Sequence, residues 1–121
     1  MRIALALLLI VHGVAHGVGF AVPWGLLPSD EPVDTTLLGG RLDLGEAGSR
    51  AYGVLWLAVG VLFAAVGLQA LFGRGAWPTW SVGLALLSGV MCLLSLPVTL
   101  VGLLANAAVL VAVWVWKNNG Y

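Results

Sequence analysis

The sequence predicts an all-α membrane protein, a four-transmembrane-helix bundle with a long outer loop between helices 1 and 2. Of its 121 residues, 61% are hydrophobic and only 8% are charged, and the mean hydropathy is +1.07. Soluble domains carry about 25% charged residues, and a chain of this size cannot bury so much apolar surface by itself. All five acidic residues also lie between positions 30 and 46. Composition and charge placement together indicate a chain that folds in lipid.

Two apolar segments of membrane-spanning length come first. A helix needs about 20 apolar residues to cross roughly 30 Å of hydrocarbon, and residues 3–22 and 51–72 each meet that length. The first ends at Pro23 and the second at Gly73, both of which are strong helix breakers. The start of the chain also resembles a signal peptide, with Arg2 ahead of an apolar run. Because that run continues past any cleavage site, we expect a retained transmembrane helix.

The last apolar segment is too long for a single crossing. It runs for 36 residues, from position 81 to 116, and at about 1.5 Å per residue this far exceeds the thickness of a bilayer. Pro97 is its sole proline, and proline is tolerated in the first turn of a helix but breaks an interior one. The sequence therefore predicts spans at about 78–95 and 97–117, an antiparallel pair in a single membrane domain, 1–121.

Charge placement orients the four spans. Both termini fall on one side, together with Arg2, Arg74 and Lys117 and with no acidic residue. By the positive-inside rule this side is cytoplasmic, so we expect a multi-pass protein of the bacterial inner (plasma) membrane, with loop 23–50 outside. Tryptophans favour the two interfaces. We place Trp24 at the outer one and four others at the inner one: Trp77, Trp80, Trp114 and Trp116.

The outer loop contains the pattern of a small β-hairpin. Residues 35–38 and 41–44 flank Gly39-Gly40, and paired glycines suit turn positions with positive φ. An isolated hairpin is marginal, so it would need to rest on the helix ends. The alternative is an irregular loop whose leucines lie on the membrane surface.

Small residues recur at helical spacing and predict close packing between helices. In lipid, close contact comes from small residues that let backbones approach. A GxxxG pair, Gly13 and Gly17, lies in the first span, and glycines recur every seven residues in the second. Serines do the same in the third span, where we expect packing and hydroxyl bonds to the preceding turn rather than a polar conduit. The two heptad sets are Gly53, Gly60 and Gly67, and Ser81, Ser88 and Ser95.

His12 and His16 are the main candidate site residues. Four residues apart, they project from one face of the first span, and an ionisable residue at membrane depth is a functional hypothesis by default. One interpretation has both neutral and hydrogen-bonded inside the bundle. A second has them bind a quinone, a lipid or another small molecule. A third is a metal or a haem, although no carboxylate or thiolate pair lies near to complete a metal site.

Other candidates surround the histidines in the expected bundle. Asn106 lies at a depth similar to that of His12, so the two side chains could meet. Trp56, with Tyr52 and Phe63, forms an aromatic strip that could be a cleft wall or ordinary core. Arg50 is expected to bond a loop carboxylate or a lipid phosphate. Cys92 is the single cysteine, which excludes an internal disulfide, and we expect it to be inert in its apolar helix.

Several segments resemble a family of small bacterial four-helix membrane proteins, the DoxX-like group. The motif HGxxHxxGF occurs here from His12 to Phe20, the pattern GxLW occurs from Gly53 to Trp56, and GxxxN occurs from Gly102 to Asn106. The resemblance implies a four-helix fold and a role close to quinones. Many relatives carry a charged residue before the fourth span, where this chain has Leu96-Pro97-Val98-Thr99.

The sequence excludes some functions and leaves two open. There is no basic patch for nucleic acid, no nucleotide-binding glycine loop and no membrane-embedded carboxylate for proton-coupled export. We expect a non-catalytic accessory or assembly subunit, in a homo-oligomer or a larger membrane complex. The alternative is a DoxX-like binder of a quinone, lipid or similar hydrophobic molecule, with a pocket formed by His12, His16, Trp56, Asn106 and Arg50. Neither function requires a cofactor, although the histidines leave a quinone or haem open.

Overall fold

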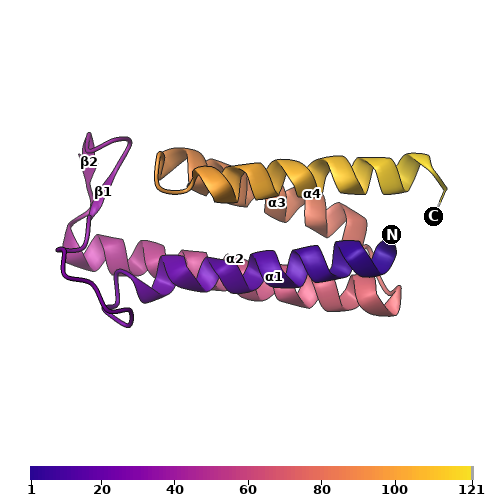
Figure 1. The fold of residues 1–121 in the computed structure, drawn as a ribbon, viewed down its shortest axis with the longest axis horizontal. Helices are drawn as coiled ribbons and strands as arrows, with labels where there is room; N and C mark the ends of the chain where they lie inside the picture. The colour runs from indigo at the N-terminus through magenta and orange to yellow at the C-terminus, as the bar shows by residue number, and fades with distance from the viewer. Residues whose placement is uncertain (121) are drawn as a thin grey trace.

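The computed structural model describes residues 1–120 and shows four long helices, with a two-stranded hairpin after the first (Figure 1). The helices are α1 (Arg2–Ala21), α2 (Gly45–Phe72), α3 (Trp77–Leu94) and α4 (Leu100–Asn118). All four are long and apolar enough to cross a membrane, and many of their outward-facing leucines and valines are exposed. This confirms the predicted all-α bundle and makes the chain a multi-pass membrane protein by length and composition.

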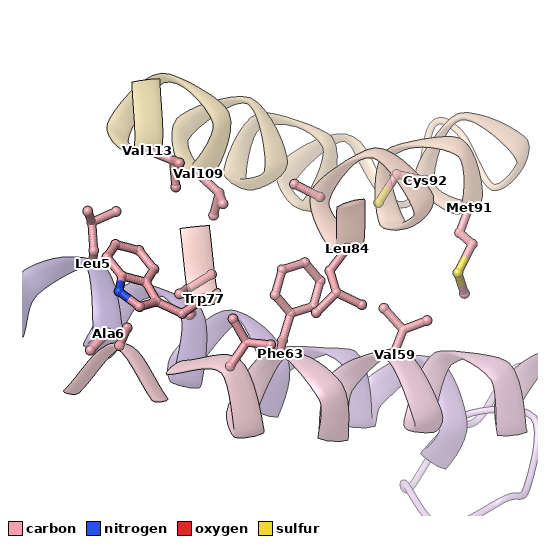
Figure 2. Close-up of a cluster of buried hydrophobic side chains, with 14 of the residues drawn as sticks. Leu5, Ala6, Val59, Phe63, Trp77, Leu84, Met91, Cys92, Val109 and Val113 are labelled. Carbon is pink, nitrogen blue, oxygen red and sulfur yellow. The ribbon is translucent and has the colours of Figure 1, made fainter. Parts of the chain in front are cut away.

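The bundle is built from two closely packed helix pairs. α1 packs mainly on α2, and α3 packs mainly on α4, while contacts between the pairs are fewer. The N-terminus and the C-terminal end of α4 lie at one end, and the hairpin lies at the other (Figure 1). The core runs between the pairs, where Phe63 points from α2 toward Leu84 of α3 (Figure 2). Trp77, the first residue of α3, lies in this core, 3% exposed, and packs on Trp116 with ring centroids 4.8 Å apart, so its ring faces the bundle rather than lipid.

Glycines bring α1 and α2 into backbone contact. A Cβ added at Gly60 would lie 2.6 Å from the carbonyl oxygen of Gly13, and one at Gly13 would lie 2.5 Å from that of Gly60. Gly53 and Gly67 also face α1 at short range, as the heptad spacing predicts. Gly17 has nothing within 4 Å, so the predicted GxxxG pair does not form one contact track.

Two helix boundaries differ from the sequence-based prediction. α2 begins at Gly45 rather than at residue 51, because the Asp43 carboxylate accepts the Gly45 N–H at 2.9 Å and acidic Glu46 suits the positive end of a helix. α4 begins at Leu100 rather than at residue 97, and Pro97 lies in a turn over residues 95–99. The turn follows from proline, which disfavours helical geometry in the residue before it.

The predicted hairpin is confirmed. β1 (Thr36–Leu37) pairs antiparallel with β2 (Leu42–Asp43), and Gly39 and Gly40 both have positive φ in the turn. The Leu38 N–H donates to the carbonyl oxygen of Leu94 at 2.8 Å. The hairpin therefore rests on the end of α3, as a two-stranded sheet requires for stability.

Candidate functional site

A buried polar cluster joins α1, α3 and α4 at the middle of the bundle. His12 and His16 project from one face of α1 and are 6% and 3% exposed. Ser88 of α3 and Asn106 of α4 are 0% and 2% exposed and meet them there. Buried polar groups are costly without partners, so the cluster is expected to be hydrogen-bonded throughout.

The four side chains form one continuous hydrogen-bonded network. His12 Nε2 lies 3.0 Å from Asn106 Oδ1, and Asn106 Nδ2 lies 2.9 Å from Ser88 Oγ. Ser88 Oγ lies 2.8 Å from His16 Nε2, and His16 Nδ1 lies 2.8 Å from the backbone oxygen of His12. The predicted meeting of His12 with Asn106 is confirmed, as are the predicted bonds of the histidines to a serine and a backbone carbonyl.

The network has one proton arrangement in which both histidines are neutral. A carbonyl oxygen only accepts, so His16 Nδ1 carries its proton and His16 Nε2 must accept from Ser88. Ser88 then accepts from the Asn106 amide, and the Asn106 oxygen accepts from His12 Nε2–H. With the amide of Asn106 reversed, His16 would have to be an imidazolium, which is costly at membrane depth.

Aromatic rings enclose the histidines on the α2 side. His12 packs edge-on against Phe63, with ring centroids 4.8 Å apart, and His16 lies 5.0 Å from the ring of Trp56. The two imidazoles are themselves 4.7 Å apart, at an interplanar angle of 87°. The aromatic strip predicted on the second span is therefore partly core, at Phe63, and partly wall, at Trp56.

A cavity of about 630 Å³ begins at the histidines and extends toward the hairpin. A volume of this size suits a drug-sized ligand. The side chains at its edges are exposed residues of α1, of the turn before α4 and of α4 itself. The cavity therefore opens sideways, toward lipid, between α1 and α4. Exposed Val11 and Val18 stand on one side, and Val98 and Val101 on the other.

The hairpin segment lines the end of the cavity away from the histidines. Asp34, Thr35, Thr36 and Leu37 line it there. The Thr36 hydroxyl and backbone N–H donate to Asp34, at 2.6 and 2.8 Å, and hold the pKa of that carboxyl below its usual value. These bonds hold the conformation of the loop that lines this end of the cavity.

Only some of the predicted site residues line this cavity. His12, His16 and Trp56 do. Asn106 lies behind the histidines, as their hydrogen-bond partner. Arg50 lies apart, bonded to Glu46 at 2.9 Å, with its guanidinium 5.5 Å from the Trp24 ring, and it lines a separate cavity of about 290 Å³. The predicted bond of Arg50 to a carboxylate forms, but Glu46 belongs to the first turn of α2 rather than to a loop. The structure does not bring Arg50 to the histidines.

Several polar residues of the site were not singled out as site residues by sequence reasoning. Ser88 links the two halves of the network, and Ser95 and Thr99 line the cavity. Tyr52, named in the sequence only as part of a possible cleft wall, lines it too. The Tyr52 hydroxyl donates to the Met91 carbonyl at 3.0 Å. The regular serine spacing was visible in the sequence, but nothing in it distinguished Ser88 from the other two serines.

The metal interpretation gains no support from the geometry. Residues 1–120 contain no group of three or more histidine, cysteine, aspartate or glutamate side chains placed to hold an ion. Both nitrogens of His16 are hydrogen-bonded, so joint ligation by the two imidazoles would break one of these bonds.

Fold and site define a class: a small multi-pass helical bundle with a side-opening apolar cavity that ends at buried histidines. Comparison with known proteins finds no matching family model, no matching curated protein and no matching solved structure.

Proposed function

We propose that this protein binds a small hydrophobic molecule, of the quinone or lipid type, that enters its cavity sideways from the bilayer. The observation that carries the proposal is the 630 Å³ cavity, whose lining is mostly apolar and which ends at His12 and His16. Ligand sites combine such apolar walls with a few polar groups. The resemblance to DoxX-like proteins favours the same function.

The opening between α1 and α4 supports entry from lipid rather than from water. Its rim consists of valines, of which Val98 and Val101 are 87% and 79% exposed. The hairpin segment lines the opposite end of the cavity. A ligand with low water solubility can therefore enter without leaving the hydrocarbon.

We place the chain in a bacterial inner membrane with both termini in the cytoplasm. Arg2, Arg74 and Lys117 lie at the end of the bundle that holds both termini, and the acidic hairpin segment lies at the other (Figure 1). The positive-inside rule favours this orientation. The cavity then lies in the half of the bundle nearer the outer leaflet.

The role of a non-catalytic accessory subunit, in a homo-oligomer or larger complex, stays a prediction. The glycines expected to serve close packing at positions 13, 53, 60 and 67 meet neighbours inside the chain. No observation on the remaining surface favours a protein partner over lipid, so we rank this role second.

Native mass spectrometry of the gently extracted protein tests the proposal. Ala15 lines the cavity, and Ala15→Trp would fill it. Ala58 is an exposed alanine of α2 outside the lining, so Ala58→Trp is the matched control. We expect a bound small molecule on the wild type and on Ala58→Trp that is lost from Ala15→Trp. Equal adducts on all three proteins, or none on any, would contradict the proposal.

A further inference from the structure

We infer that the ligand carries a hydroxyl group that donates a hydrogen bond to Nδ1 of His12. The inference rests on the proposed function and specifies the chemical class of the ligand: an apolar body with a hydrogen-bond donor, such as a quinol, a phenol or a long-chain alcohol. Three observations on the cavity lead to it.

The first is that His12 Nδ1 has no partner within the protein. His12 makes its hydrogen bond through Nε2, and none of the described residues bonds to Nδ1. Within residues 1–120, no fully buried side-chain nitrogen or oxygen lacks a partner. His12 is 94% buried and lines the cavity. Its free nitrogen is therefore not fully enclosed by protein, and the cavity is the open space that His12 lines.

The second is that this nitrogen accepts and does not donate. The network assigns the single proton of the neutral His12 ring to Nε2, which donates to Asn106. Nδ1 then presents a lone pair. A carbonyl-only ligand would place oxygen against this lone pair, whereas an O–H group is complementary to it.

The third is that most hydroxyl protons in the cavity are already used. Tyr52 donates to the Met91 carbonyl and Thr99 donates to the Cys92 carbonyl. Ser95 lies 3.2 Å from the Tyr52 oxygen, whose proton is engaged, so Ser95 donates to it. A ligand meets more acceptors than donors here.

Three donors are not fully used by the network: the Cys92 thiol, a weak donor beside Asn106, and two groups nearer the hairpin. The Ser49 hydroxyl, near the start of α2, is not hydrogen-bonded to the described residues, and the indole N–H of Trp56 has the Tyr52 hydroxyl as its neighbour. Both side chains line the cavity. Trp56 packs on Gly19, two turns beyond His12 on α1. A second oxygen on the ligand, as in a quinol, could accept there without changing the donor at His12.

The test compares hydroxyl ligands with their methyl ethers on the wild-type protein in detergent. One pair is a decyl hydroquinone and its dimethyl ether, and the other is a long-chain isoprenoid alcohol and its methyl ether. A neutral hydrogen bond of ordinary strength predicts roughly three- to tenfold tighter binding of the free hydroxyl. The pair in which the hydroxyl compound binds more tightly than its methyl ether shows whether the site prefers an aromatic or an aliphatic hydroxyl.

The outcomes separate the inference from the function on which it rests. If hydroxyl and ether bind equally well, the cavity binds ligand and the donor assignment is wrong. If neither member of either pair binds, the proposed function itself fails for these ligands, and the inference fails with it.

The ¹⁵N spectrum of histidine-labelled protein supplies a readout at the atom itself. On adding the hydroxyl ligand, we expect the His12 Nδ1 signal to move toward that of a hydrogen-bonded nitrogen. The His16 Nδ1 signal is the internal control, because that nitrogen already donates to a carbonyl. An unchanged His12 signal at saturating ligand would overturn the inference.

Discussion

Adding one methyl group at Gly60 should destabilise the bundle, although the same change usually favours a helix. The backbones of α1 and α2 meet at this residue. A Cβ at Gly60 would lie 2.6 Å from the carbonyl oxygen of Gly13 and 2.8 Å from Cβ of His16, where ordinary contacts are 3.4–4 Å. Gly60→Ala therefore requires the two helices to separate by about 1 Å.

Two opposing free energies set the size of the effect. Overpacking a close contact costs about 1–3 kcal/mol, and replacing glycine by alanine within a helix returns about 0.5–1 kcal/mol. The middle of these ranges gives an expected net loss of about 1 kcal/mol for Gly60→Ala. Gly17 is also helical, but it has nothing within 4 Å. Gly17→Ala should therefore be neutral or slightly stabilising.

Equilibrium unfolding in mixed micelles with increasing sodium dodecyl sulfate, followed by circular dichroism, measures both variants. The expected order of unfolding free energy is Gly17→Ala at or above wild type, and Gly60→Ala below it. Because the methyl group at Gly60 also pushes on His16, the histidine ¹⁵N signals should shift in that variant alone. Equal stability of the two variants would refute the glycine-contact account of α1–α2 packing.

Three further predictions follow from the network, the charges and the hairpin. Asn106→Leu removes bonds to His12 and Ser88, each worth about 0.6 kcal/mol in membranes, and should lower thermal stability in detergent, whereas Asn119→Leu at the exposed end of α4 should not. A reporter that is active only in the periplasm should stay inactive when fused after Tyr121; activity would reverse the topology. Bonds from Thr35 and Gly45 hold the pKa of Asp43 below its usual 3.8, so they stabilise the hairpin above that pH and are lost as pH falls through the lowered pKa. The NMR shift of the Gly45 amide, which donates to Asp43, should show this transition, and its persistence at Gly45 in Asp43→Asn would contradict the assignment.

The fold followed from sequence where the signals were local. Hydropathy and breakers gave four spans, and paired glycines gave the hairpin turn, because chain length and backbone conformation depend mainly on neighbouring residues. The starts of α2 and α4 did not follow. The first involves a hydrogen bond from the Gly45 N–H to the Asp43 side chain, and the second a turn around Pro97 that the helical period does not reveal.

The site was partly predictable for a related reason. His12 and Asn106 were expected to meet because their positions along the first and fourth spans put them at a similar depth in the bilayer. Depth says nothing about rotation, so sequence reasoning assigned Asn106 and Arg50 to a pocket that neither lines. It also gave Gly17 a packing role, because spacing shows which residues share a face but not where the partner helix lies.

Photocrosslinking in native membranes tests most directly whether the cavity holds a defined ligand. A benzophenone amino acid is placed at Ala15, which lines the cavity, and separately at Ala58, which faces outward. After irradiation, the intact mass of each protein shows what lay against that position. We predict a single small-molecule adduct at position 15 and a mixture of bulk phospholipids at position 58. The same phospholipid mixture at both positions would contradict the account.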